Sequence, residues 1–293
     1  MLSQLRIQYS EICYIERMMG SQTVDAIRAT VPRDLPDWLI SHGKHWITTD
    51  EIAATLAIPV EQVPPIVARL RRAGRLFSPT RGGYVPIPAE YRSWHAVPAS
   101  HFIDPMMRFL DHDYYVGYLS AAEIHGAAHQ RPQVFQVITD ARLNSRTFDR
   151  VSIEFTSSAR TAQRPTTAVN TPTGTMKVSI PETTVLDLVA SPAHGGGLSN
   201  VATVLGELLG DGLLDMSRLA SLAKDYPTAV QQRSGWLLER VADEVGAEID
   251  LAPLEEVARA RLKRTPLAAA GRHAGPFNER WNILVNTDVE SDL

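Results

Sequence analysis

Within residues 46–88 the hydrophobic positions first follow a helical spacing and then the alternation of short strands. One apolar stripe consists of Val63, Ile66, Val67 and Leu70. These residues have the spacing i, i+3, i+4 and i+7, which predicts an amphipathic helix. Thr48 and Glu51 have the spacing of a capping box and predict a preceding helix over 49–56. Two short apolar runs within 75–87 predict a hairpin. Helix, turn, helix and hairpin in this order are typical of a winged helix-turn-helix, which binds DNA.

The limits of these helices are set by local residues. Pro64 and Pro65 are tolerated in the first turn of a helix but not deep inside it. Either the second helix therefore begins at about 63–64, or residues 59–63 form a looser lead-in. An earlier segment, Leu35–Ser41, is expected to be the first helix of the same domain.

Strand-like and helix-like segments are mixed in the second part of the chain. Strands are predicted over Val134–Thr139, Val151–Thr156, Thr166–Val169, Thr175–Ile180 and Trp281–Val285. Helices are predicted from Pro181 onward and over about 199–209, 216–224, 231–245 and 253–262. Ser120 and Glu123 have capping-box spacing, which predicts one more helix start. We therefore expect an α+β protein, with an N-terminal winged helix-turn-helix domain followed by a mixed α/β C-terminal domain.

Three parts are expected along the 293 residues, which suffice for two ordinary domains. Residues 1–30 are predicted to form an amphipathic helical extension. A winged helix DNA-binding domain is expected over 31–95 and a larger domain over 96–293. The boundary is placed around residues 95–100, after a segment that several prolines interrupt.

Charge is distributed unevenly between these parts. Residues 61–95 hold six Arg against two Glu, although the whole chain has a net charge of −4. Residues 96–293 hold eighteen Lys and Arg against twenty-four Asp and Glu, a net charge of −6. Phosphate neutralisation dominates affinity for nucleic acid, so the basic segment and not the acidic remainder is expected to bind it.

The candidate DNA-binding side chains lie opposite the apolar stripe and on the hairpin. Small side chains there would let the helix backbone enter a major groove, while arginines would contact phosphates or guanines. The predicted contacts are Gln62, Pro65, Ala68, Arg69, Arg71, Arg72, Arg75 and Arg81. A solvated helix face is the alternative interpretation, since Arg commonly covers surface with its aliphatic stem.

Composition narrows the remaining function classes. Hydrophobic residues make up 44% of the chain, and no apolar run approaches the roughly 18 residues of a membrane span. Charged residues also interrupt Met1–Gly20, so no signal peptide is expected. The single cysteine, Cys13, cannot form an intrachain disulfide, which fits a reducing compartment and excludes a cysteine-based zinc finger. We expect a cytoplasmic protein without a membrane partner.

Motifs for catalysis, metals or cofactors are weak. His125 and His129 are one helical turn apart, but no Glu follows the first His as metalloprotease chemistry needs. The segment at Gly195–Gly197 lacks the Lys-Ser/Thr pair of a P-loop. We therefore expect a protein that is not an enzyme, with no catalytic residue, no metal site and no cofactor. A nuclease that uses Asp and His side chains from residues 111–129 is kept as an alternative.

Several longer segments occur in an informative order. They are Arg81–Pro88, Tyr114–Gly126, Gln133–Thr139, Ile180–Leu188, Gly235–Glu239 and Phe277–Asn286. In this order they resemble motifs of the AbiEi family, antitoxins of bacterial type IV toxin–antitoxin and abortive-infection systems. Together they span most of residues 46–286. The chain departs from the family where Glu182-Thr183 replaces the usual Glu-Arg, and residues 1–30 have no counterpart.

The resemblance implies a function in two parts. The winged helix would bind double-stranded operator DNA and repress its own operon, as a monomer or as a dimer on spaced half-sites. The C-terminal domain would counteract a toxin of the nucleotidyltransferase superfamily. This chain lacks a Gly-Ser that is followed by paired Asp, the combination that such a transferase needs, so it would be the antitoxin. A ligand-sensing winged-helix regulator with an effector-binding C-terminal domain is the alternative.

Overall fold

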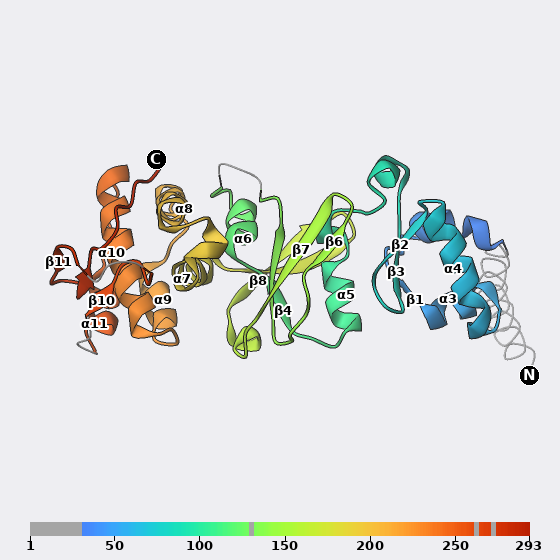
Figure 1. The fold of residues 1–293 in the computed structure, drawn as a ribbon, viewed down its shortest axis with the longest axis horizontal. Helices are drawn as coiled ribbons and strands as arrows, with labels where there is room; N and C mark the ends of the chain where they lie inside the picture. Colours follow the sequence, from blue (N-terminus) through green and yellow to red (C-terminus); the bar gives the residue numbers. More distant parts are fainter. Residues whose placement is uncertain (1–30, 129–131, 261–263, 271–273) are drawn as a thin grey trace, which may run out of the picture. The chain divides into compact units, whose positions relative to one another are not determined.

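The computed structural model describes residues 31–128, 132–260, 264–270 and 274–293. Cys13, His129 and the helix expected over residues 1–30 lie outside the described residues. Contacts between Cα atoms divide the chain into two units. The N-terminal unit consists of the chain up to Leu110 together with the short segment Thr147–Val151. The C-terminal unit consists of Asp111–Arg146 and Ser152–Leu293. The expectation of mixed α and β structure is confirmed (Figure 1).

The N-terminal unit contains the elements that the sequence predicts, in the predicted order, and one additional strand. They are α2 (Leu35–Ser41), β1 (Ile47–Thr48), α3 (Thr49–Leu56), α4 (Val63–Arg72), β2 (Leu76–Thr80) and β3 (Gly83–Pro86). The strands form a sheet in the order β1-β3-β2, with antiparallel pairing throughout. Further along this unit, α5 (Ile103–Phe109) follows two 3₁₀ helices, η3 (Ala89–Trp94) and η4 (Ala99–His101).

The capping box predicted at the start of α3 is confirmed. The Thr48 side chain accepts from the Glu51 amide at 3.3 Å, and the Glu51 carboxylate accepts from the Thr48 amide at 2.7 Å. Both sequence interpretations of the following segment hold. A short 3₁₀ helix, η2 (Val60–Gln62), leads into α4, and the two prolines occupy the first turn of α4.

A shared core holds these helices on the small sheet. The apolar stripe of α4 is buried through Val63, Val67 and Leu70, with Ile66 partly buried against the same cluster. The other buried members are Leu35, Leu39, Ile47, Ile52, Ala53 and Leu76. Because this stripe faces the core, the opposite face of α4 is left to solvent.

The C-terminal unit contains a mixed sheet with the order β7-β5-β4-β9-β8. Its strands are β4 (Tyr114–Val116), β5 (Phe135–Thr139), β7 (Val151–Ser157), β8 (Thr166–Thr171) and β9 (Gly174–Ser179), and β6 (Arg146–Phe148) precedes β7 along the chain. Pairing is antiparallel in β4–β5 and β8–β9 and parallel in β4–β9 and β5–β7. The predicted strands between residues 134 and 180 are confirmed.

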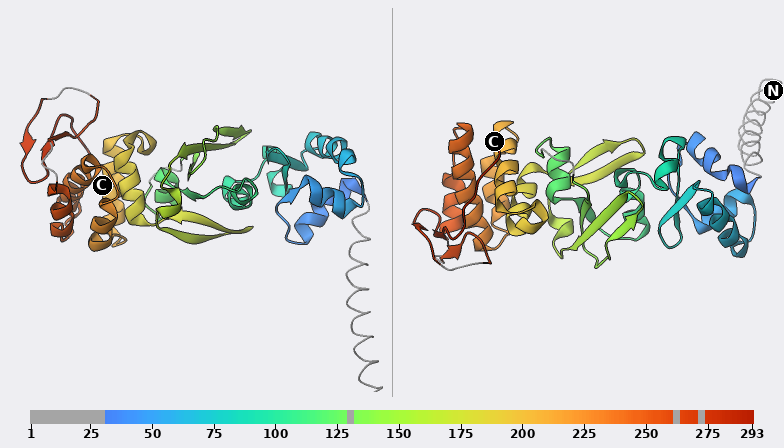
Figure 2. Two further views of the ribbon diagram at one scale, coloured as in Figure 1. Left: turned by 90° about the horizontal axis from the view of Figure 1, so that it is seen from below. Right: turned by 45° about the horizontal axis from the view of Figure 1, so that its top comes forward.

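A helical layer accompanies this sheet. It consists of α6 (Tyr118–Ile124), α7 (Pro181–Ala190), α8 (Leu198–Gly210), α9 (Met216–Ala223), α10 (Thr228–Val245) and α11 (Ala252–Arg259), with η5 (Thr161–Gln163) and η6 (Pro192–Gly195) as 3₁₀ turns. The gold and orange helices of residues 181–259 lie side by side in both views of Figure 2. Short strands β10 (Thr265–Pro266), β11 (Phe277–Asn278) and β12 (Ile283–Leu284) form a third sheet in the order β10-β12-β11.

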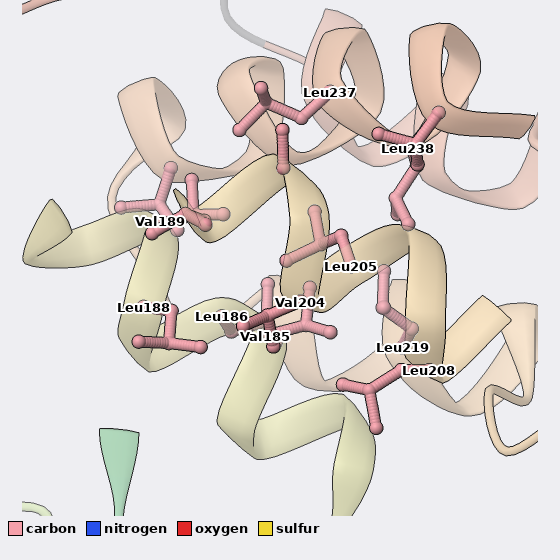
Figure 3. Packing of buried hydrophobic residues seen from close by; sticks show 14 of the residues in the cluster. Val185, Leu186, Leu188, Val189, Val204, Leu205, Leu208, Leu219, Leu237 and Leu238 are labelled. Atoms are coloured by element: carbon pink, nitrogen blue, oxygen red, sulfur yellow. The ribbon is translucent and has the colours of Figure 1, made fainter. Parts of the chain in front are cut away.

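The main hydrophobic core lies between these helices. Figure 3 shows leucines and valines of α7, α8, α9 and α10 pointing toward one another. Leu186, Leu205 and Leu237 are each completely inaccessible to solvent. Within the described residues, no helix combines the length and apolar character that crossing a membrane requires.

One predicted helix start is wrong. Ser120 and Glu123 do not form a capping box, because α6 begins two residues earlier, at Tyr118. The Ser120 hydroxyl instead accepts from the Gln136 amide at 2.9 Å and contacts the Val134 carbonyl at 3.3 Å. This hydroxyl therefore joins α6 to β5, a tertiary role that the spacing of two residues does not reveal.

Candidate nucleic-acid interface

The outer face of α4 carries small and cationic side chains. Pro65 and Ala68 are exposed in the first two turns, and Gln62 is exposed just before the helix. Arg69, Arg71 and Arg72 are exposed in the last turn. Cations near a helix C-terminus are also favoured by the helix dipole. The position of these arginines alone therefore agrees with either a binding surface or simple helix stabilisation.

Ion pairing distinguishes these arginines from others in the N-terminal unit. Arg33, Arg75, Arg92 and Arg108 each form an ion pair with an aspartate. In the part of the chain that the structure describes, Arg69, Arg71, Arg72 and Arg81 form no ion pair with a carboxylate. Their guanidinium groups are thus available to an external anion, a property that helix stabilisation does not require.

Arg81 lies in the turn between β2 and β3. Its neighbour Gly82 has a left-handed φ of +81° and accepts a hydrogen bond from the Thr49 amide at 3.1 Å. The Ser78 hydroxyl donates to the Gly83 carbonyl at 2.9 Å across the hairpin. A Cβ atom at Gly83 would lie 2.3 Å from the Trp46 ring. The turn that presents Arg81 is therefore fixed by its neighbours.

Arg75 departs from the sequence expectation. Its side chain is only 22% exposed, and its Nη2 atom lies 2.6 Å from the Asp37 carboxylate on α2. An arginine that is half-buried and already neutralised is a poor phosphate contact, because its ion pair would have to break first. We therefore correct the predicted set of outward-facing cations by removing Arg75.

The residues of the nuclease alternative do not converge. His112 pairs with Asp140 at 3.2 Å, whereas Asp113 pairs with Lys177 at 3.6 Å. The Nε2 atom of His125 lies 2.7 Å from the Ser179 carbonyl oxygen. The described residues contain no cluster of three or more His, Cys, Asp or Glu side chains that could hold a metal ion. Each side chain thus contacts a different neighbour.

A buried polar cluster in the C-terminal unit escaped the sequence analysis. The Asp187 carboxylate on α7 accepts hydrogen bonds from the Tyr115 hydroxyl at 2.9 Å and the Tyr226 hydroxyl at 2.8 Å. Burial raises the pKa of the Asp187 carboxyl to about 6, although both hydrogen bonds and the Arg164 charge lower it. Burial, and then the Asp187 charge, also raise the pKa of each tyrosine far above its ordinary value.

A second connection joins α10 to the chain segment before β12. The Trp281 ring is fully buried, and its indole N–H donates to Glu239 at 2.8 Å. A Cβ atom at Gly235 would lie 2.1 Å from this ring. Arg280 also pairs with Glu239 and with Glu255 of α11. Residues from the segments singled out in the sequence therefore meet in the core, which assigns them structural roles.

A family model described as the AbiEi antitoxin C-terminal domain matches residues 115–240. A search of curated proteins found no match. The crystal structure of the RV2827C protein from Mycobacterium tuberculosis is similar in fold, with a TM-score of 0.57, 17% sequence identity, and coverage of 85% of this chain and 89% of that chain.

The family match confirms the resemblance inferred from the sequence for the segments that it contains. Those segments lie between Tyr115 and Glu239. The hairpin segment Arg81–Pro88 and the closing segment Phe277–Asn286 lie outside the matched residues, and their resemblance stays a prediction.

Proposed function

Because residues 115–240 match the AbiEi antitoxin C-terminal domain, we propose that this chain is an antitoxin that also represses its own operon. In this proposal residues 31–95 form a winged helix that binds operator DNA, and residues 96–293 counteract a toxin of the nucleotidyltransferase class. The family supports a regulator without catalytic activity. Both activities would take place in the cytoplasm.

The unpaired guanidinium groups of α4 and the hairpin turn carry the DNA-binding half of the proposal. α4 follows α3 after a short turn, and the hairpin of β2 and β3 follows α4. Winged domains that bind in a major groove have the same order of elements. Arg69, Arg71 and Arg72 are exposed and have no carboxylate partner among the described residues. Unpaired arginines on a rigid helix would release counterions on contact with phosphates.

The antitoxin half rests on the family match, and the nature of the toxin rests on the resemblance alone. The C-terminal unit is acidic, so a polyanion is not its expected ligand. A protein is the partner that this charge permits. The proposed division of labour therefore places DNA on the N-terminal domain and the toxin on the C-terminal domain.

Replacement of Arg69, Arg71 and Arg72 by alanine tests the DNA-binding half. Electrophoretic mobility shifts with the promoter that adjoins the reading frame should show weaker binding by the triple variant. The slope of the logarithm of affinity against the logarithm of salt should become shallower by roughly one unit per lost phosphate contact.

Arg108→Ala is the matched control, because Arg108 is also exposed in the N-terminal unit but is paired with Asp104. This variant should bind the promoter as the wild type does. Equal affinity and equal salt slope for the triple variant and the wild type would contradict the assignment of this face.

A further inference from the structure

The N-terminal unit contains one short segment that is distant in sequence from the rest of it. The chain leaves this unit after Leu110, returns to it for Thr147–Val151, and then continues in the C-terminal unit. We call Thr147–Val151 the returning segment. It contains the end of β6, the start of β7 and the turn between them. The N-terminal unit therefore includes side chains from far beyond residues 31–95, the range expected to bind DNA.

The hairpin of β2 and β3, which is the wing of the proposed winged helix, is buried on both faces. Leu76 of β2 belongs to the core that this hairpin shares with α2, α3 and α4. Successive side chains of a strand point to opposite faces, so Phe77 and its cross-strand partner Val85 point away from that core. Both are nevertheless buried, with exposed fractions of 6% and 2%. Other side chains therefore cover this outer face of the wing.

The returning segment supplies part of this cover through Phe148. The centre of its ring lies 5.6 Å from that of Phe77 and 6.3 Å from that of Phe102, and the Phe77 and Phe102 rings are 5.2 Å apart. Tilted and edge-to-face ring pairs at these separations are favourable. Phe102 is completely buried and Phe148 is half-buried. The wing is thus packed between the helical core on one face and this cluster of rings on the other.

The other end of the returning segment contacts residues that follow the wing in sequence and lie near the end of α4. The Asp149 carboxylate lies 3.5 Å from Nδ1 of His95. A Cβ atom at Gly74, just after α4, would lie 3.3 Å from the His95 ring. The Arg150 guanidinium carbon lies 6.0 Å from the centre of the Trp94 ring. Exposed contacts of this kind add little stability, but they connect the segment that carries Phe148 to the end of α4.

The returning segment also lies beside two of the predicted DNA contacts. An open hollow of about 490 Å³ is lined by Arg71 and Arg72 of α4, by Phe77 of β2, and by Phe148 and Asp149. The carboxylate of Asp149 would repel phosphates at this place, so direct contact with DNA is not the role that the segment suits best. Its packing against β2 favours a role in the placement of the wing.

We propose that Phe148 positions the wing for DNA binding. The inference rests on the DNA-binding half of the function proposed above, and it adds that this half needs a residue from outside residues 31–95. Phe148 fixes the outer face of β2, and β2 leads directly into the turn that carries Arg81. Arg81 and the arginines of α4 then contact one duplex at the same time. Contacts that are already in place before binding lose little conformational freedom when the complex forms.

The full-length variant Phe148→Ala tests this role in mobility shifts with the promoter that adjoins the reading frame. Its affinity should be about threefold to tenfold lower, because the phosphate contact of the wing is lost. The salt slope should become shallower by roughly one unit, as for Arg81→Ala. The double variant Phe148→Ala/Arg81→Ala should bind no more weakly than either single variant, since both changes remove the same contact. A purely structural role of Phe148 would leave the salt slope unchanged and make the two losses additive.

Phe277→Ala is the matched control, because Phe277 is a partly exposed phenylalanine of the C-terminal unit. It should bind the promoter as the wild type does. Phe148→Tyr keeps the ring between Phe77 and Phe102 and should retain the affinity and the salt slope of the wild type. Thermal unfolding verifies that each variant is folded, and the smaller truncation Phe148→Val replaces Phe148→Ala if the latter does not fold.

Four outcomes overturn the positioning role. If the wild type binds the promoter and Phe148→Ala binds equally well, the returning segment does not affect DNA binding, and the proposed function stands. If Phe148→Ala binds more weakly with an unchanged salt slope and additive losses, Phe148 only stabilises the fold, and the function again stands. If Arg81→Ala binds as the wild type does, the wing does not contact DNA. If the wild type itself does not bind the promoter, the DNA-binding half of the function and this inference fail together.

Discussion

At the scale of single residues, burial of Asp187 disfavours the charged form of its carboxyl group. Burial raises the pKa of its carboxyl from 3.8 to about 6. The hydroxyls of Tyr115 and Tyr226 satisfy the carboxylate and limit the penalty. Between these two pKa values the folded chain binds a proton that the unfolded chain has released. The contribution of Asp187 to stability is therefore greatest at low pH and falls as pH rises through about 6.

Asp187→Asn should remove this pH dependence. As pH rises from about 4 to about 7, the free energy of unfolding of the wild type should fall relative to that of the variant, by roughly 2–3 kcal/mol. Urea unfolding of both proteins across this range measures the difference. A difference that stays constant with pH would show that Asp187 has an ordinary pKa.

The arginines show what residue-level sequence reasoning can and cannot provide. Arg72 was expected to face outward because the apolar stripe of α4 fixes the helix orientation, and it is exposed. Arg75 was expected to do the same, but Asp37, far away in the sequence, neutralises it. Periodicity specifies which face of a helix is exposed to solvent. It does not specify which charges meet after folding.

At the scale of elements, α10 has a glycine at the position where the Trp281 ring packs against it. Gly235 lies in the middle of this helix, where glycine lowers helix stability relative to alanine. The absence of a side chain there makes room for Trp281, whose N–H is bound by Glu239 one turn further along α10. The close approach offsets the conformational cost of the glycine.

Gly235→Ala should therefore destabilise the C-terminal unit by about 1–3 kcal/mol or more, because the added methyl group overlaps the Trp281 ring. Gly210→Ala is the matched control, since Gly210 is also helical and nothing lies within 4 Å of the position that a Cβ atom would take there. It should leave stability unchanged or slightly raised. Urea unfolding followed by far-ultraviolet circular dichroism compares the two, and equal stabilities would refute the role of the glycine.

Elements with strong local signals were predictable. α2, α3 and α4 have caps, prolines or an apolar stripe within their own sequence, and they begin at or close to the expected residues. β1 has only two residues and exists because it pairs with β3, so its sequence carries no strand signal. The capping box wrongly predicted at Ser120 is the opposite case, a local signal without the element. The residues there have the spacing of a capping box, but no helix begins at that position.

At the scale of the whole molecule, the two proposed activities are assigned to different parts of the chain. The basic face of α4 was predictable from charge and periodicity in one continuous segment. The cluster of Tyr115, Asp187 and Tyr226 was not, because its members come from three distant segments that only the fold brings together. Contacts assembled from distant segments are beyond local pattern analysis.

This arrangement predicts that the two activities can be separated. The triple variant of α4 should lose repression of a promoter fusion and still protect cells that co-express the adjoining reading frame. Loss of both activities in this variant, with its fold retained, would contradict the division. A wild type that represses but never protects would indicate the ligand-sensing regulator instead.

The enclosure of Trp281 has a practical consequence. Its indole packs against Gly235 of α10 and donates its N–H to Glu239 of the same helix, so the chromophore has a rigid and asymmetric environment. Such a ring contributes near-ultraviolet ellipticity that vanishes when tight packing is lost. Because the chain has four other tryptophans, the difference between the spectra of the wild type and Trp281→Phe isolates this contribution, which reports the detachment of the closing segment from α10 without any attached label.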